Sequence, residues 1–485
     1  MAGSKDTRDH VASDFPQKTS GRSAAGGKSF RHGLVVGKFC PLHRGHMHLI
    51  DAAVAACDAV LVISYTKPGF PGCPPQARER WLAELYPSVR RLVVDDAILA
   101  AACARLGLPA RALPPDEAAA AVHREFTAWL CWAICGAAVD AVFTSEDYGD
   151  GFALALSAYF SARGPGPVRV RHVCVDRARL AVPVSGTRVR ADVHGQRGFL
   201  DSAVYADFVE RVCILGGESS GKTTLARALA QRLGSTWAPE VGRELWEAKG
   251  GALGFADMWT IAAGQVARED ALARVARRWL VCDGSALTTV FYSLDGFGRV
   301  DERVQRLARR PYAAVLVCAP DFPFVQDGTR RDAAFRDRQH RWYLDTLDRA
   351  GVRYRVLEGR LETRLDAARA WLEDASGHDG RAAGVAFLDG GGADTLQVGQ
   401  RGAQAPFVRR CGRGRRPGQA CRGNTKTDRP FHDATPLPET RPGTWPRGSS
   451  IGQAPPAARP SWPLASSSQA RAASRRVSSR PSSTR

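Results

Sequence analysis

The sequence lacks the cysteine patterns of disulfide-stabilised and zinc-binding proteins. Its 12 cysteines are scattered along 485 residues, with no C-x-x-C pair and no zinc-ligand spacing. Cys131 and Cys135 lie four residues apart, on one helix face, and are expected to be small buried side chains. These absences exclude a disulfide scaffold and favour a reduced, cytoplasmic setting.

Long apolar segments are also missing. The amino terminus has no apolar stretch of the kind found in signal peptides. The most apolar region, residues 126–145, is interrupted by Asp140, whereas a bilayer span needs about 20 uninterrupted apolar residues. We predict a buried helix at 128–137 and a strand at 141–144 in this region, and therefore no membrane partner.

Acidic residues are scarce at the carboxy-terminal end. The formal net charge is +19, but residues 401–485 hold 17 Arg and Lys against 3 Asp and Glu, and so account for +14 of it. The basic character belongs to this tail and is weak evidence that the folded part binds nucleic acid. We expect no specific nucleic-acid partner. The alternative is a regulatory DNA-binding protein. In that case salt-dependent DNA binding would survive deletion of residues 376–485.

Two series of short β-branched runs alternate with helical periodicity. The first lies at 33–37, 59–64, 91–96, 140–145 and 168–176, and the second at 211–215, 279–283, 312–318 and 353–357. This alternation predicts an α/β protein with two tandem doubly wound parallel sheets. The predicted organisation is a disordered segment at 1–31, domains at 32–208 and 209–375, and a disordered Arg-, Pro- and Ser-rich tail at 376–485.

The segment GKFCPLHRGH directly follows the first predicted strand. A strand, a glycine turn and a helix start aim backbone N–H groups at an anion, which suits a phosphate. Gly37, Lys38 and Phe39 are candidate ATP-binding residues, and the imidazoles of His43 and His46 can reach one triphosphate from adjacent sides. Zinc ligation and polar packing are alternatives for the histidine pair, but no third ligand of the right type is near.

A second segment, VSGTRVR, lies far downstream at 184–190. Ser185 is a good N-cap for a following helix, and the hydroxyls of Ser185 and Thr187 can hold a phosphate there. The Arg190 guanidinium would neutralise charge on a departing pyrophosphate.

Together the two segments resemble the nucleotidyltransferase superfamily, which is marked by an HxGH turn and a later S-x-T-x-x-R segment. The resemblance implies a Rossmann-like fold and attack by a phosphate oxygen of the acceptor on the α-phosphorus of ATP. His43, His46 and Arg190 would then be the catalytic residues that stabilise charge, with Mg²⁺ assisting.

A P-loop begins the second series. The strand RVCIL leads into GGESSGKTT, which contains G-x-x-x-x-G-K-T between a strand and a helix. The candidate ATP-binding residues are Gly216, Gly217, Glu218, Ser219, Ser220, Gly221, Lys222, Thr223 and Thr224. In such a loop Lys222 bridges the β- and γ-phosphates, while the Thr223 hydroxyl ligates Mg²⁺. Asp283 ends a later strand, where a Walker-B acid would lie near the same Mg²⁺.

Two further pairs of residues are candidates in this second domain. Arg330 and Arg331 precede a predicted helix, where a lid could supply arginines to the transferring phosphoryl group, or they form a solvated basic surface. Glu240 and Arg243 could contact hydroxyls of the acceptor, or they form an ion pair.

An adenylyltransferase unit followed by a P-loop kinase unit resembles the bifunctional NadR-type family, in which a nicotinamide-nucleotide adenylyltransferase is joined to a ribosylnicotinamide kinase. The resemblance covers about residues 32–375 and includes GKFCPLHRGH, R-x-R-W, FTSE, VSGTRVR, LGGESSGKTT, E-V-G-R, CDGSALTT and FVQDGTRR. It implies that nicotinamide riboside is phosphorylated to the mononucleotide, which is then joined to AMP from ATP to give NAD. Trp81, in the R-x-R-W segment, and Trp132 are candidate substrate-binding aromatics, with core packing as the alternative for Trp132.

The sequence departs from this family in two places. Family kinases usually carry D-x-D where this chain has Asp283-Gly284-Ser285, so an adenylyltransferase with a nucleotide-sensing kinase domain is an alternative. Some members carry an N-terminal helix-turn-helix, which 30 polar residues cannot form, so no operator binding is expected. An adenylyltransferase for another small phosphate is a further alternative, and the oligomeric state stays open.

Overall fold

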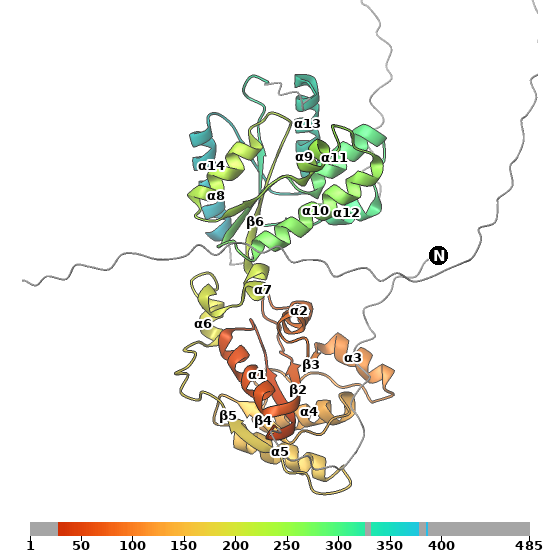
Figure 1. The fold of residues 1–485 in the computed structure, drawn as a ribbon, viewed down its shortest axis with the longest axis vertical. Coiled ribbons are helices and arrows are strands. Elements are labelled where there is room, and N and C mark those ends of the chain that lie inside the picture. Colours follow the sequence, from red (N-terminus) through yellow and green to blue (C-terminus); the bar gives the residue numbers. More distant parts are fainter. Residues whose placement is uncertain (1–27, 325–330, 378–384, 387–485) are drawn as a thin grey trace, which may run out of the picture. The chain divides into compact units, whose positions relative to one another are not determined.

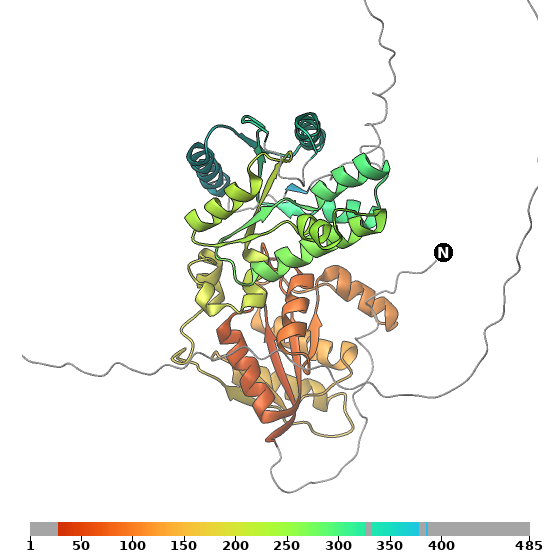
Figure 2. The same ribbon diagram turned by 45° about the horizontal axis from the view of Figure 1, so that its top comes forward.

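The β-branched runs of the sequence form two five-stranded parallel sheets with helices on both faces (Figures 1 and 2). The structure is a computed structural model that describes residues 28–324, 331–377 and 385–386. The prediction of two doubly wound α/β sheets is confirmed. The tail at 387–485 and the segment at 1–27 lie outside the described residues.

The first sheet has the strand order β3-β2-β1-β4-β5, with every neighbouring pair parallel. Its strands are β1 (Phe30–Gly37), β2 (Cys57–Ser64), β3 (Arg90–Val93), β4 (Ala141–Thr144) and β5 (Arg171–Cys174). The strand order reverses at β1. In such sheets ligands bind at the carboxyl ends of the strands beside this reversal, which is where the histidine turn follows β1.

Alternating side chains of the first sheet enter two hydrophobic cores. Val35 and Val62 pack with α1 (Arg44–Ala56) and α2 (Pro75–Leu85) on one face. Leu34 and Leu61 pack on the other face with α3 (Asp96–Arg105), α4 (Ala120–Trp129), the π-helical turn η1 (Leu130–Ile134) and α5 (Gly149–Ser161). The shorter elements that follow are α6 (Gly186–Ala191), η2 (Arg197–Phe199), α7 (Ser202–Tyr205) and η3 (Ala206–Phe208).

The second sheet has the order β11-β10-β6-β8-β7 and is also parallel throughout. Its strands are β6 (Glu210–Gly216), β7 (Thr236–Ala238), β8 (Trp279–Asp283), β10 (Ala314–Cys318) and β11 (Arg355–Leu357). The order reverses at β6, so the P-loop leaves the sheet at the reversal point. The neighbouring strand β8 ends at the same edge and delivers Asp283 beside the loop.

Helices also cover both faces of the second sheet. Val212 and Ile214 of β6 pack with α8 (Lys222–Arg232) and α14 (Leu361–Gly377), while Cys213 and Leu215 face the opposite side. The elements on or beyond that side are α9 (Val241–Ala248), α10 (Phe255–Ala273), α11 (Ala286–Phe297), α12 (Glu302–Ala308) and α13 (Ala333–Arg349). Because successive side chains of β6 are buried on opposite faces of the sheet, the sequence of this strand is continuously apolar, as is typical of a fully buried strand.

The structure corrects several predicted boundaries. The helix expected at 128–137 runs instead from residue 120 to 134, and Gly136, with φ of +61°, follows it in the left-handed conformation that ends helices. The predicted strand at 312–318 is divided into β9 (Pro311–Tyr312) and β10, and β7 was not predicted. Within the expected tail, β12 (Val385–Ala386) pairs antiparallel with β9.

The apolar region at 126–145 is shared between helical residues and β4, as the interruption at Asp140 predicts. Within the described part of the chain, no helix combines the length and the apolar character needed to cross a membrane.

Candidate active sites

The turn after β1 is tightly packed around glycine and phenylalanine. A Cβ on Gly37 would lie 2.9 Å from the ring of Phe39, so glycine is needed there for the close approach. Phe39 has a positive φ of 49°, is only 1% exposed, and sets its ring edge against His46 with centroids 4.9 Å apart. The Phe39 side chain therefore supports the histidine turn, and only its backbone is available to a nucleotide.

The two histidines cap the start of α1 reciprocally. The His46 backbone N–H donates to Nδ1 of His43 at 3.3 Å, and the His43 backbone N–H donates to Nδ1 of His46 at 3.4 Å. Their rings stack with centroids 3.6 Å apart. Because Nδ1 of His43 accepts a hydrogen bond, the proton of its neutral imidazole sits on Nε2, which is then a donor.

Both imidazoles are neutral near pH 7. Burial, followed by the positive charges of Arg179 and Arg190, lowers the pKa of His43 to about 4. Burial and the neighbouring His43 hold the pKa of His46 well below its ordinary value. The histidines therefore offer hydrogen bonds to an anion, while the positive charge at this turn comes from the arginines. Among the described residues, no group of three His, Cys, Asp or Glu side chains is placed to hold a metal ion.

The structure brings the VSGTRVR segment onto the histidine turn. Ser185 caps α6 by accepting the Arg188 N–H at 3.2 Å, as predicted. Arg190 donates to the carbonyl oxygen of Cys40 at 2.8 Å and to the Thr187 hydroxyl at 3.2 Å. A Cβ on Gly186 would lie 3.8 Å from Nε2 of His43, so the donor nitrogen faces this segment.

Lys38 has a partner that the sequence did not indicate. Its ammonium lies 2.9 Å from the carboxylate of Asp116, which also accepts bonds from the Thr66 hydroxyl and the Lys67 N–H. No short motif marks Asp116, because the loop that carries it has neither helical nor strand periodicity.

The two tryptophans proposed as substrate contacts have packing roles. Trp81 is 2% exposed, and its indole N–H donates to Asp207 at 2.8 Å. Trp132 stacks on Phe160 with centroids 6.2 Å apart, within the core formed by α4 and α5. The structure supports the core-packing alternative for Trp132 and gives Trp81 the same role.

The P-loop after β6 depends on glycines at two close approaches. A Cβ on Gly216, which has φ of +141°, would lie 2.7 Å from the carbonyl oxygen of Cys318. A Cβ on Gly217 would lie 2.5 Å from the carbonyl oxygen of Arg336. Ser219 and Gly221 have positive φ, the Ser220 hydroxyl donates to the Gly217 carbonyl at 2.7 Å, and Thr224 is exposed on the first turn of α8.

The P-loop also brings Lys222 and Thr223 to the end of β8. Lys222 donates to the Gly217 carbonyl at 3.0 Å, and the Thr223 hydroxyl donates to Oδ2 of Asp283 at 2.6 Å. The other oxygen of Asp283, Oδ1, is buried without a hydrogen-bond partner among the described residues. Burial raises the pKa of Asp283, against the opposing effects of Lys222 and the Thr223 hydroxyl. A hydroxyl beside a buried carboxylate with a free oxygen fits the oxygen ligands that Mg²⁺ requires.

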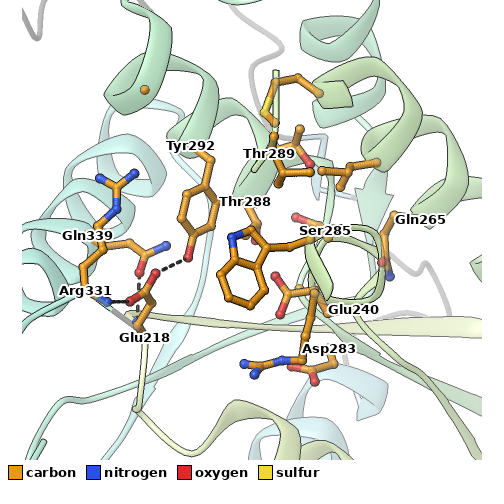
Figure 3. A pocket seen from close by; sticks show the side chains of 18 of the residues that line it. Glu218, Glu240, Gln265, Asp283, Ser285, Thr288, Thr289, Tyr292, Arg331 and Gln339 are labelled. Carbon is orange, nitrogen blue, oxygen red and sulfur yellow. Dashed lines mark hydrogen bonds between the residues drawn. The ribbon is translucent and has the colours of Figure 1, made fainter. Parts of the chain in front are cut away.

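A cavity of about 480 Å³ opens beside this loop (Figure 3). Three carboxylates line it, those of Glu218, Glu240 and Asp283. The predicted residues Ser219, Lys222, Arg243 and Arg331 line it as well. Arg330 lies outside the described residues. Ser285, Thr288 and Thr289 of the CDGSALTT segment also line it, although they were not among the predicted site residues. Further lining side chains that sequence reasoning missed include Trp246, Gln265, Tyr292, Phe297 and Gln339.

Glu218 organises one wall of the cavity, as Figure 3 shows. Its carboxylate accepts the Tyr292 hydroxyl at 2.8 Å and the Arg331 backbone N–H at 2.9 Å. Its own backbone N–H donates to Gln339 at 2.9 Å. The Arg331 guanidinium also pairs with Asp295. Glu218 thus ties the P-loop to α11 and to the segment before α13 through its side chain, and to α13 itself through its backbone N–H.

Glu240 and Ser285 lie across the cavity from Glu218 (Figure 3). Glu240 immediately precedes α9, and burial raises the pKa of its carboxyl, with Lys222 opposing the shift. Ser285 is 5% exposed and caps α11 by accepting the Leu287 N–H at 3.2 Å. Trp246 could have been predicted from the sequence as a residue of this site. It follows Arg243 by three residues and therefore lies on the same face of the helix.

Fold and sequence define a chain with two α/β units, one that carries an HxGH turn and one that carries a P-loop. An AAA domain family model matches residues 211–364. The chain is 28% identical over 323 residues to the trifunctional NAD biosynthesis/regulator protein NadR of Escherichia coli (strain K12), covering 63% of this chain and 73% of that protein. It is 27% identical over 320 residues to the protein of the same name from Salmonella typhimurium (strain LT2), with the same coverage.

Solved structures give the same relationship for the fold. The chain is similar to NadR in complex with NR, with a TM-score of 0.52 and 19% identity, over 72% of this chain and 97% of that one. It is equally similar to NadR in complex with NAD and AMP-PNP, with a TM-score of 0.52 and 18% identity, over 71% and 97% of the two chains. The resemblance to NadR-type proteins predicted from the motifs is confirmed.

Proposed function

We propose that this chain carries out two ATP-dependent steps of NAD synthesis. The first is phosphorylation of nicotinamide riboside at its 5′-hydroxyl in the cavity of the second sheet, and the second is adenylyl transfer from ATP to the mononucleotide at the histidine turn. The observation that carries the proposal is that one chain similar to NadR brings together both motif sets, each at the reversal point of its own sheet. The product of the first step is the substrate of the second.

The cavity of the second sheet suits a riboside. Its volume of about 480 Å³ falls in the range of small-molecule sites, and Trp246 and Tyr292 offer aromatic surface for a pyridinium ring. Lys222 would contact the phosphate oxygens of ATP. Thr223 and Asp283 would hold Mg²⁺, which when bound neutralises charge on those oxygens. In the reaction the riboside hydroxyl attacks the γ-phosphorus, and ADP leaves.

The first site suits transfer at the α-phosphorus. A phosphate oxygen of the mononucleotide attacks that atom, the bond to the bridging oxygen breaks, and pyrophosphate leaves. Nε2 of the neutral His43 donates a hydrogen bond to the charge that develops, and Arg190 supplies positive charge. No covalent intermediate with the protein is needed, so positioning and charge stabilisation account for the catalysis.

A second candidate function rests on Ser285, which stands where family kinases usually carry a second carboxylate. In that case the second sheet binds nucleotides without phosphorylating the riboside, and only the adenylyl transfer takes place.

The test supplies purified protein with ATP and Mg²⁺, and with either nicotinamide riboside or its mononucleotide. Chromatography should show the mononucleotide and then NAD from the riboside, and NAD alone from the mononucleotide. Conversion of the mononucleotide only would support the second candidate. If neither substrate gives NAD, both candidates are wrong.

A further inference from the structure

The three carboxylates of the cavity differ in what engages them. Both oxygens of Glu218 accept hydrogen bonds, from the Tyr292 hydroxyl and the Arg331 N–H. Asp283 accepts the Thr223 hydroxyl on one oxygen, and its other oxygen is shielded from solvent. Glu240 receives no hydrogen bond from any other residue in the described part of the chain, although it lines the cavity.

Glu240 lies on the same side of the cavity as Asp283 and Ser285, across from Glu218 (Figure 3). The charged and titratable groups that act on it come from every element around it. Within its electrostatic range are Lys222 of α8, Arg243 of α9, Asp283 of β8, Glu218 of the P-loop, Tyr292 of α11 and Tyr343 of α13. Glu240 is therefore an acceptor facing the space in which Lys222 meets the phosphates.

We propose that Glu240 is the general base of the riboside phosphorylation. This inference rests on the proposed kinase function. The Glu240 carboxylate takes the proton of the attacking hydroxyl while that oxygen bonds to the γ-phosphorus, and the bond from phosphorus to the β–γ bridging oxygen breaks. The proton ends on Glu240, and ADP leaves with the bonding electrons.

The neighbouring side chains do not offer an equivalent base. Ser285 carries no carboxylate, and its hydroxyl oxygen already accepts the Leu287 N–H. Both oxygens of Glu218 already accept hydrogen bonds, and the carboxylate of Asp283 is assigned with Thr223 to Mg²⁺. Burial raises the pKa of Glu240 above its ordinary value, and a base is more effective when its pKa is closer to the working pH.

The test compares Glu240→Gln, which keeps the size and removes the base, with Glu240→Asp, which withdraws the carboxylate by one methylene. The matched control is Glu247→Gln, an exposed glutamate of α9, the helix that follows Glu240, which lies outside the cavity lining. We measure kcat and KM for nicotinamide riboside from pH 5 to 9, together with riboside affinity by calorimetry in the presence of ADP.

We expect Glu240→Gln to lower kcat about 10²–10⁴-fold with a nearly unchanged riboside affinity, and to remove the acidic limb of the kcat profile. Glu240→Asp should retain more activity than Glu240→Gln, and the control should match the wild type. If Glu240→Gln keeps the acidic limb and a third or more of the wild-type kcat, the inference about Glu240 is wrong while the proposed kinase function stands. The same holds if the variant loses only riboside affinity. A wild-type protein that does not phosphorylate the riboside would overturn the proposed kinase function and this inference with it.

Discussion

His43 illustrates how packing decides the chemistry of one residue. It is 5% exposed, and its Nδ1 is occupied by the backbone of the turn that it caps. An imidazole in that position cannot act as a charge switch near neutral pH, although its ordinary pKa would allow it. It acts instead as a fixed donor.

We predict that His43 contributes no inflection to adenylyl transfer between pH 5.5 and 8. Burial and the nearby arginines lower its pKa to about 4, so it stays neutral in the folded protein over that whole range. The check is the pH profile of kcat/KM in the wild type and in His43→Gln, which should have the same shape, while the variant falls about 10²–10³-fold in rate. A wild-type inflection near pH 6.5 that the variant lacks would contradict this.

Asp283 shows a conflict between stability and function at a single residue. Its buried Oδ1 has no partner among the described residues, and burial raises its pKa. We predict that Asp283→Asn raises the melting temperature by a few degrees in EDTA near pH 7, because the ionised carboxylate is the form that burial disfavours. The same variant should lose riboside phosphorylation at least about 100-fold.

The sign of the pH effect follows from that raised pKa. The folded state holds the Asp283 proton more tightly than the unfolded state, so this group favours folding at low pH and loses that contribution as the pH rises through its folded-state pKa. Thermal melts of the two proteins should therefore converge on acidification. A variant that melts below the wild type at pH 7 would show that Asp283 stabilises the fold through Thr223.

At the scale of secondary-structure elements, α10 links the cavity to a buried acid. Gln265 lines the cavity, accepts the Val241 N–H at 3.0 Å, and donates to Glu269 at 3.4 Å one turn further along. Glu269 is fully buried, accepts the Tyr312 hydroxyl at 3.1 Å, and forms an ion pair with Arg310 at 3.2 Å. The helix start of α9, which carries Arg243, is thereby anchored to α10.

We predict that Glu269→Gln flattens the dependence of stability on pH. Burial raises the pKa of Glu269 to about 7, with Arg310 opposing the shift. Between the pKa of this carboxyl in the unfolded chain and pH 7, the folded state therefore binds more protons than the unfolded state. The free energy of unfolding then falls as the pH rises. From pH 5 to 8 the wild type should lose about 5 °C more in melting temperature than the variant. Parallel melting curves for the two proteins would contradict a titration at this site.

The elements also show what the sequence could predict. Both glycine-rich turns and most strands were predictable, since strand periodicity and the P-loop pattern are local. The cavity was not, because Trp246, Tyr292 and Gln339 come from α9, α11 and α13 and meet only in the folded protein. Strand β7 was missed because three residues are too few for an alternation to be visible. The helix at 120–134 was predicted to begin too late because no residue before Phe126 in it is buried, and its apolar first turn, which includes Val122, is exposed.

At the scale of the whole molecule, the histidine turn and the P-loop are separate loops, each following the central strand of its own sheet. If each loop serves one reaction, one variant in each site should remove one activity and leave the other. The two reactions are also consecutive, because the product of the kinase is the substrate of the adenylyl transfer. A variant with a defective kinase should therefore still make NAD when the mononucleotide is supplied.

We predict this pattern for Lys222→Ala and His46→Ala. Lys222→Ala removes the ammonium of the P-loop and should abolish phosphorylation of the riboside, yet form NAD from added mononucleotide at the wild-type rate. His46→Ala removes one of the stacked imidazoles and should accumulate the mononucleotide from the riboside without making NAD. Because His46 also caps α1, Arg190→Gln provides a second variant of that site and leaves the reciprocal histidine cap in place. Loss of both activities in both Lys222→Ala and Arg190→Gln would mean that the two reactions do not occupy separate sites.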